Sequence, residues 1–186
     1  RDREVVMRKT AVAVIVATAA LISILASPAA AACQGAGARP GQQSTGEAQA
    51  AITCLINKTR AAHRLRAVRA SAPLVAAALG HSNAMVSRNF FGHVGPDGTP
   101  SARVAAAGYM AGARAWGIGE TLGWGIAKGA TPRRIVRGWM HSAAHRSIML
   151  RRGFRHVGVG VVAGSPVPGF DHRAATVTAV FGFRKG

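Results

Sequence analysis

The stretch WGIGETLGWG, residues 116–125, decides whether this chain is entirely helical or also contains a sheet. Each glycine in a helix interior costs about 1 kcal/mol relative to alanine. Glycine occupies four of these ten positions, so the segment is unsuited to a helix. We predict an extended or looped segment in which neighbouring backbones pack closely.

Glu120, within this stretch, has no local turn to explain it, because its neighbours are glycines and apolar residues such as Trp116, Leu122 and Trp124. A carboxylate in apolar surroundings needs an arginine, a histidine, a metal ion or another hydrogen-bond donor. Glu120 is therefore a candidate site residue.

The sequence pattern predicts two helices before this stretch and one after it. From Glu47 onward, apolar residues recur at three- and four-residue spacing. A second helix is predicted near Ser71, with Pro73 in its first turn, where a missing N–H costs nothing. Thr131 is a suitable N-cap for a third helix that has Pro132 at its first position. The residues predicted on the apolar faces are Ala48, Ala51, Ile52, Leu55, Ile56, Thr59, Ala62, Leu74, Ala77, Ala78, His81, Met85, Arg88, Ile135, Val136, Trp139 and Met140, whereas Asn57, Lys58 and Arg60 are expected to point elsewhere.

Two alternating segments, residues 156–163 and 175–183, predict an antiparallel hairpin at the C-terminal end. Helices come first and strands later, which is typical of the α+β class. The expected architecture is helices packed on a small antiparallel sheet.

Residues 1–32 have the pattern of a signal peptide. Met7 to Lys9 form a basic start, Ala11 to Leu25 form an apolar run, and small residues follow. Residues 1–6 are interpreted as an upstream extension, residues 33–46 as a polar, glycine-rich linker, and residues 47–186 as the folded domain. The run is shorter than the ~20 residues of a membrane-spanning helix, so we expect a secreted or envelope protein that meets the membrane only through its signal peptide.

Two cysteines remain after this segment, Cys33 and Cys54. In an exported protein a pair is most simply a disulfide. The alternative is a lipid on Cys33, which would leave Cys54 without a partner.

The formal net charge of +18 would concentrate the protein near polyanions, such as nucleic acid, anionic lipid or a phosphate-bearing wall polymer. A plain bias in composition is the competing interpretation, since alanine is also in excess. Export and the absence of a recognition motif argue against nucleic acid.

Ordinary structural roles can explain the histidines and the remaining acids. His81 on an apolar helix face is most simply a hydrogen-bonded core residue. Asp97 is expected to bond to backbone N–H groups in its Pro-Asp-Gly turn. His141 and His145 share one face only if helix continues between them, and Ser142 stands where zinc proteases carry their catalytic glutamate.

Five motifs in fixed order resemble the CAP superfamily of cysteine-rich secretory and pathogenesis-related proteins, and within it the secreted bacterial, SCP-like branch. They are FFGHVGPDGTP (90–100), AGY (107–109), GIGETLGWG (117–125), TPRRIVRGWMHSAAHRSIML (131–150) and FRHVGVGV (154–161). The resemblance implies an α–β–α sandwich.

The resemblance also implies a cleft in which His93, Glu120 and His145 converge, often around a divalent metal such as zinc. Two departures are visible, because Thr121 replaces the usual asparagine and Ser142 replaces a second glutamate of animal members.

Two classes of function remain open. The first is a monomeric extracellular binding module for anionic lipid or a cell-envelope polymer, with the His/Glu cleft and no certain cofactor. The second is a hydrolase of peptide or envelope substrates. It would use either a metal on His93, Glu120 and His145, or Ser142 as nucleophile with His145 and Glu120.

Overall fold

A computed structural model describes residues 33–170 and 173–186 of the chain. The predicted signal peptide, Asp171 and His172 lie outside these residues. The elements in chain order are α1 (Thr45–Ala62), β1 (Arg69–Ala70), α2 (Ala72–Ser87), α3 (Pro100–Ala106), β2 (Ala115–Ile126), the 3-10 helix η1 (Ala127–Ala130), α4 (Pro132–His141), α5 (Ala143–Met149), β3 (His156–Ala163) and β4 (Ala174–Lys185). None of the helices in this described part is long and apolar enough to cross a membrane.

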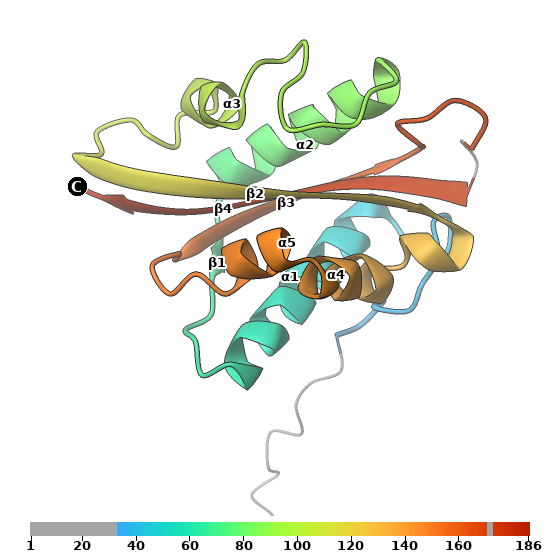
Figure 1. The fold of residues 1–186 in the computed structure, drawn as a ribbon, viewed down its shortest axis with the longest axis horizontal. Helices are drawn as coiled ribbons and strands as arrows, with labels where there is room; N and C mark the ends of the chain where they lie inside the picture. Colours follow the sequence, from blue (N-terminus) through green and yellow to red (C-terminus); the bar gives the residue numbers. More distant parts are fainter. Residues whose placement is uncertain (1–32, 171–172) are drawn as a thin grey trace, which may run out of the picture. The chain divides into compact units, whose positions relative to one another are not determined.

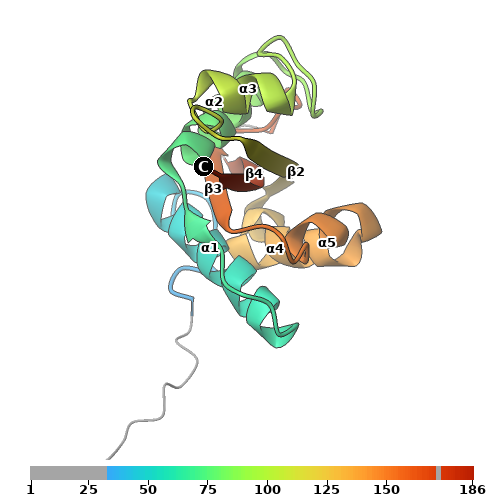
Figure 2. The ribbon, with the colours of Figure 1, turned by 90° about the vertical axis from the view of Figure 1, so that its left-hand side faces the viewer.

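The domain is an α–β–α sandwich, as predicted. A sheet separates α2 and α3 on one face from α1, α4 and α5 on the other (Figure 1), and the view along the layers shows the same order (Figure 2). One apolar cluster fills the space between the sheet and α1 with α4, and a second lies between the sheet and α2.

The sheet has the strand order β1-β3-β4-β2. The predicted hairpin is confirmed, since β3 and β4 pair antiparallel, and the glycine-rich stretch forms β2, which pairs antiparallel with the other side of β4. The two-residue β1 pairs parallel with β3, so the sheet is mixed rather than purely antiparallel. This order leaves β2 as an edge strand.

The glycines of β3 bring α2 directly onto the sheet. A methyl group at Gly158 would overlap the backbone of Leu74, and one at Gly160 would overlap the backbone of Leu79. The strand therefore alternates buried valine with glycine because a helix backbone occupies the space that side chains would need.

Helix α1 begins at Thr45, two residues before the predicted start. Ser44 is its N-cap, and Ser44 and Glu47 form a reciprocal capping box. These bonds, first from the Ser44 backbone and then from its side chain, lower the pKa of Glu47.

The predicted disulfide is confirmed, with an S–S distance of 2.04 Å between Cys33 and Cys54. The bond occupies the Cys33 sulfur that a lipid would need. The segment after Cys33 is also attached to α4, because the Ala36 carbonyl accepts a bond of 2.9 Å from the Arg133 backbone.

The prediction for Arg60 is wrong. Its side chain is buried and donates to the backbone carbonyls of Arg66, Met149, Arg151 and Phe154. Burial, and secondarily the charge of Arg155, lowers the pKa of Arg60. The residue therefore joins the end of α1 to the segment after α5, a contact that helical periodicity does not reveal.

Candidate functional site

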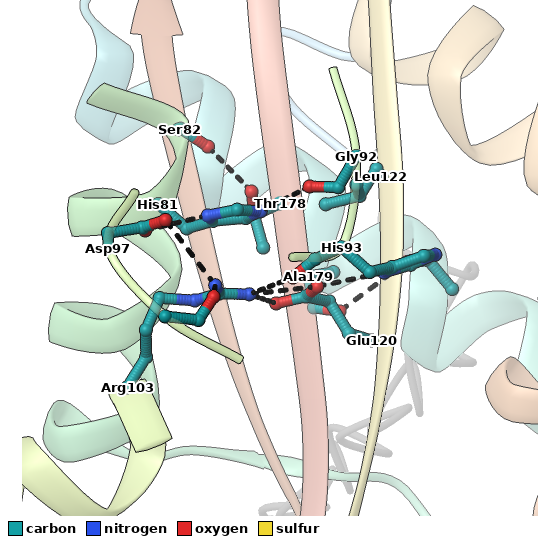
Figure 3. A network of polar contacts seen from close by, with 12 residues as sticks. His81, Ser82, Gly92, His93, Asp97, Arg103, Glu120, Leu122, Thr178 and Ala179 are labelled. Carbon is teal, nitrogen blue, oxygen red and sulfur yellow. Dashed lines mark hydrogen bonds and ion pairs between the residues drawn. The ribbon is translucent and has the colours of Figure 1, made fainter. Parts of the chain in front are cut away.

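Strand β2 places Glu120 beneath α3, where Arg103 neutralises it. The Arg103 Nη2 group donates to both carboxylate oxygens, at 3.1 Å to Oε1 and 2.9 Å to Oε2 (Figure 3). The side chains are only 6% and 2% exposed, so the pair is shielded from water. A buried carboxylate is stable as an ion only with such a partner.

Arg103 also holds the loop that carries His93. Its Nη1 donates to the Gly98 carbonyl at 2.7 Å, and its Nη2 donates to the His93 carbonyl at 3.0 Å. The Asp97 carboxylate lies 3.6 Å from the same guanidinium. One side chain of α3 therefore connects the loop at both ends to the edge strand of the sheet.

His93 is oriented by Glu120. Its Nδ1 lies 2.9 Å from Glu120 Oε1, and half of its side chain is exposed. An ionised carboxylate only accepts hydrogen bonds, so Nδ1 carries the proton. The neutral ring then presents the lone pair of Nε2, which has no protein partner among the described residues.

His81 is the predicted core histidine and is fully buried. Its Nδ1 lies 2.7 Å from Asp97 Oδ2, and its Nε2 lies 2.9 Å from the Gly92 carbonyl. Both nitrogens face oxygen atoms, so beside an ionised Asp97 the ring makes both bonds only as a double donor. The expectation that Asp97 bonds to backbone N–H groups of its own turn is wrong, because His81 and Arg103 take that carboxylate instead.

Helix does not continue from His141 to His145, which was the condition for their sharing one face. The chain leaves the helical region at Ser142 (φ −96°, ψ 122°), which ends α4 and caps α5. His141 is exposed at the end of α4 and accepts a bond of 3.4 Å from Arg137. His145 lies on α5 and is partly buried, so the two histidines do not form a helical pair.

His145 lies close enough to His93 to respond to its charge. Burial, and secondarily the His93 charge, lowers the pKa of His145. Ser142 and His145 line an open groove of about 360 Å³, whereas His93 and Glu120 belong to the adjoining hydrogen-bonded cluster. Within residues 33–170 and 173–186, no hydrogen bond joins Ser142 to His145.

The predicted metal ligands His93, Glu120 and His145 differ in how far other side chains already occupy them. No group of three His, Cys, Asp or Glu side chains in the described part of the chain is arranged to hold a metal ion. Both Glu120 oxygens are bound by Arg103, and the carboxylate supports His93 from behind, as the outer partners of metal-bound histidines do. The imidazoles of His93 and His145 are the predicted ligands that these bonds from Arg103 do not occupy.

Sequence reasoning missed two residues of this region. In the sequence, Arg103 is surrounded by Val104 and several alanines. That apolar setting was the one available sign that its side chain is buried. Tyr109 ends the AGY motif, and its buried hydroxyl lies 2.8 Å from His156 Nδ1. Burial raises the pKa of Tyr109 to about 12.

The model of the cysteine-rich secretory protein family (CAP) matches residues 54–178 of the chain. The uncharacterized protein YkwD of Bacillus subtilis (strain 168) is 33% identical over 111 residues, which are 58% of this chain and 40% of YkwD. The uncharacterized membrane protein YlbC of the same strain is 32% identical over 120 residues, which are 64% of this chain and 32% of YlbC. The matched segment thus spans less than half the length of either relative.

Solved structures share the fold. An outer surface protein from Borrelia burgdorferi has a TM-score of 0.63 at 17% identity, covering 77% of this chain and 97% of its own. An extracellular protein containing a SCP domain from Bacillus anthracis str. Ames has a TM-score of 0.53 at 23% identity, covering 78% of this chain and 45% of its own.

Replacing Arg103 by methionine should destabilise the protein by about 3–5 kcal/mol, because Glu120 and Asp97 would lose their buried counter-charge. Adding Glu120→Leu should recover part of this loss, since one uncompensated charge disappears with it. Urea unfolding of the single and double variants measures the coupling. Arg114→Met, at an exposed arginine just before β2, is the matched control. If the stability changes of the two single substitutions simply add in the double variant, the pairing of Arg103 with Glu120 is contradicted.

The pKa of His156 predicts an acid-sensitive contribution to stability. Burial, then the charges of Arg184 and Arg69, lowers its pKa. Below about pH 6.5 the unfolded chain therefore binds more protons at this position, and the folded state loses stability as the pH falls. The stability advantage of the wild type over His156→Gln should shrink between about pH 8 and 5 in urea titrations. An advantage that grows in acid would overturn the assignment.

Proposed function

The chain belongs to the cysteine-rich secretory protein (CAP) family, and from this premise we propose that it is an extracellular binding module for anionic material of the cell envelope. The observation that carries the choice of a binding module over an enzyme is the state of Glu120. Its carboxylate is buried and bound through both oxygens to Arg103. An acid held in this way supports the structure and is poorly suited to accept a proton from a substrate.

The two versions of a hydrolase have little support in the geometry. A general base needs a free lone pair near the proton it removes, whereas Glu120 is buried and already accepts bonds from Arg103 on both oxygens and from His93 on Oε1. A serine nucleophile needs an adjacent base, whereas Ser142 caps α5 with no bond to His145 in the described residues.

The charge distribution favours an anionic partner. Three acids lie in the described part of the chain, and two of them, Asp97 and Glu120, are bound internally by Arg103 and His81. Glu47 alone is exposed. The arginines on the surface therefore meet little local negative charge, and their field extends into solvent.

Helix α4 presents three exposed arginines, one of which lines the groove. Arg133, Arg134 and Arg137 are exposed on this one helix, and Arg134 lines the groove itself. This juxtaposition supports α4 as the surface that meets an anionic polymer or lipid headgroup.

Export is part of the proposal. The apolar run from Ala11 to Leu25 and the small residues after it have the signal-peptide pattern. A disulfide between Cys33 and Cys54 fits an oxidising compartment outside the cytoplasm.

Charge reversal of Arg133, Arg134 and Arg137 to glutamate should weaken binding to isolated cell walls or to phosphatidylglycerol vesicles by at least about tenfold, because the local field changes sign. The matched control carries the same change of charge at Lys58, Arg64 and Arg66, at and after the end of α1. Co-sedimentation measures both. Equal losses in the two variants, or binding by the wild type unchanged at about 0.5 M salt, would reject the proposal.

A divalent metal is a second candidate ligand, favoured by the free Nε2 of His93 and the nearby His145. Zinc bound there would supply a Lewis-acidic centre with positions open to a ligand. Glu120 would hold the His93 ring in the orientation that exposes Nε2.

Calorimetry with zinc chloride tests this candidate. Zinc should bind the wild type, His145→Ala should abolish binding, and Glu120→Gln should weaken it by about 10- to 100-fold. Exposed His141→Ala is the control. Binding that survives His145→Ala unchanged would remove His93 and His145 as the site.

A further inference from the structure

An open groove of about 360 Å³ runs beside the edge strand β2, next to the His93 cluster. Its volume lies in the range of ligand sites in proteins. The residues that matter for its chemistry are Phe91, Trp124, Arg134, Gly138, Trp139 and His145. They come from the loop after α2, from β2, and from α4 and α5.

Aromatic rings border this groove without being covered. Phe91 is 46% exposed, and Phe170, also 46% exposed, packs on Trp124 with ring centroids 6.3 Å apart. Exposed aromatic area costs roughly 25 cal/mol per Å² relative to burial. Clustered exposed rings therefore mark a surface that gains free energy when a ligand covers it.

Three glycines, Gly123, Gly129 and Gly138, are part of the groove lining. Gly138 lies within α4, and a Cβ placed there, or at Gly129, would meet no atom within 4 Å. A glycine inside a helix costs about 1 kcal/mol relative to alanine, and nothing in the packing requires one at position 138. Gly123 differs, because its Cβ would press on Trp139 at 3.1 Å. Gly138 thus keeps open a space that a side chain would fill.

The edge strand is not free to pair with a peptide at this place. The Trp139 indole donates to the Leu122 carbonyl at 2.7 Å, which occupies an outward-facing acceptor of β2. A peptide adding to the edge would need that carbonyl. The ligand must therefore be recognised by ring faces and side chains rather than by strand pairing.

Arg134 gives the groove its charge preference, and none of the groove-lining residues in the described part of the chain is acidic. A guanidinium offers a planar fork of donors that matches a carboxylate in two parallel bonds. Flat aromatic faces suit the C–H faces of pyranose rings, because the electron-rich ring face attracts the slightly positive hydrogens.

We infer that this groove binds a polysaccharide strand that contains uronic acids, with sugar rings on Phe91 and Trp124 and a carboxylate on Arg134. The inference rests on the proposed function and names the class of anionic polymer that the same surface recognises. The groove is open along the strand edge, which suits a polymer that lies across the protein.

Calorimetry with a hyaluronan decasaccharide, in which uronate alternates with an N-acetylated sugar, tests the inference on the full domain. Gly138→Gln should weaken binding by at least about tenfold, because the new side chain fills the groove. The same change should leave the melting temperature equal or higher, since glutamine is the better helix former. Gly80→Gln is the matched control, at an exposed glycine of α2 whose Cβ also meets no atom within 4 Å.

Two further variants separate the contribution of the aromatic rings to binding from that of the charge. Phe91→Ala should weaken binding of the decasaccharide and leave binding of polyphosphate unchanged. Arg134→Gln should weaken binding of both. A neutral dextran oligosaccharide should bind at least about tenfold more weakly than the uronate.

The outcomes distinguish this inference from the proposed function. If Gly138→Gln and Phe91→Ala bind the decasaccharide as the wild type does, the groove is not the glycan site, although anionic material can still bind α4. If polyphosphate or phosphatidylglycerol vesicles bind and the decasaccharide does not, the proposed function stands and the glycan inference is wrong. If none of these anionic probes binds, both are wrong.

Discussion

The contact between Arg103 and Glu120 is the constraint on which the region around His93 depends. It places an ionised carboxylate on an edge strand, beneath a short helix and away from water. The same guanidinium holds the carbonyls of His93 and Gly98. The loop between α2 and α3 is therefore fixed through charge, and the orientation of the His93 ring follows from the remaining lone pair of Glu120.

His81 and His93, which are bonded to Asp97 and Glu120, have different roles because they differ in burial. His81 is fully buried and ties α2 to the loop through Asp97 and Gly92. His93 is half exposed and offers one nitrogen to solvent. The buried members balance their charges internally, so the cluster adds little negative potential to the surface, and the arginines of α4 determine what the neighbouring groove attracts.

Local patterns predicted most of the fold. Proline near helix starts, alternating valine and glycine, and the cysteine pair each depend on a few neighbouring residues, and the corresponding helices, hairpin and disulfide are confirmed. The need of Glu120 for a partner was also predicted. The partner itself was not, because Arg103 is one of many arginines and is brought to Glu120 only by the packing of α3. Arg60, Asp97 and the groove beside β2 likewise depend on contacts between distant segments, which periodicity does not encode.

The central claim is that Glu120 is an ionised structural acid that holds a proton on Nδ1 of His93. Long-range proton–nitrogen NMR of the imidazole rings measures this most directly. The account predicts that neutral His93 in the wild type carries its proton on Nδ1 and that Glu120→Leu shifts the population toward Nε2. A wild-type His93 ring protonated on Nε2, and unchanged by Glu120→Leu, would contradict it.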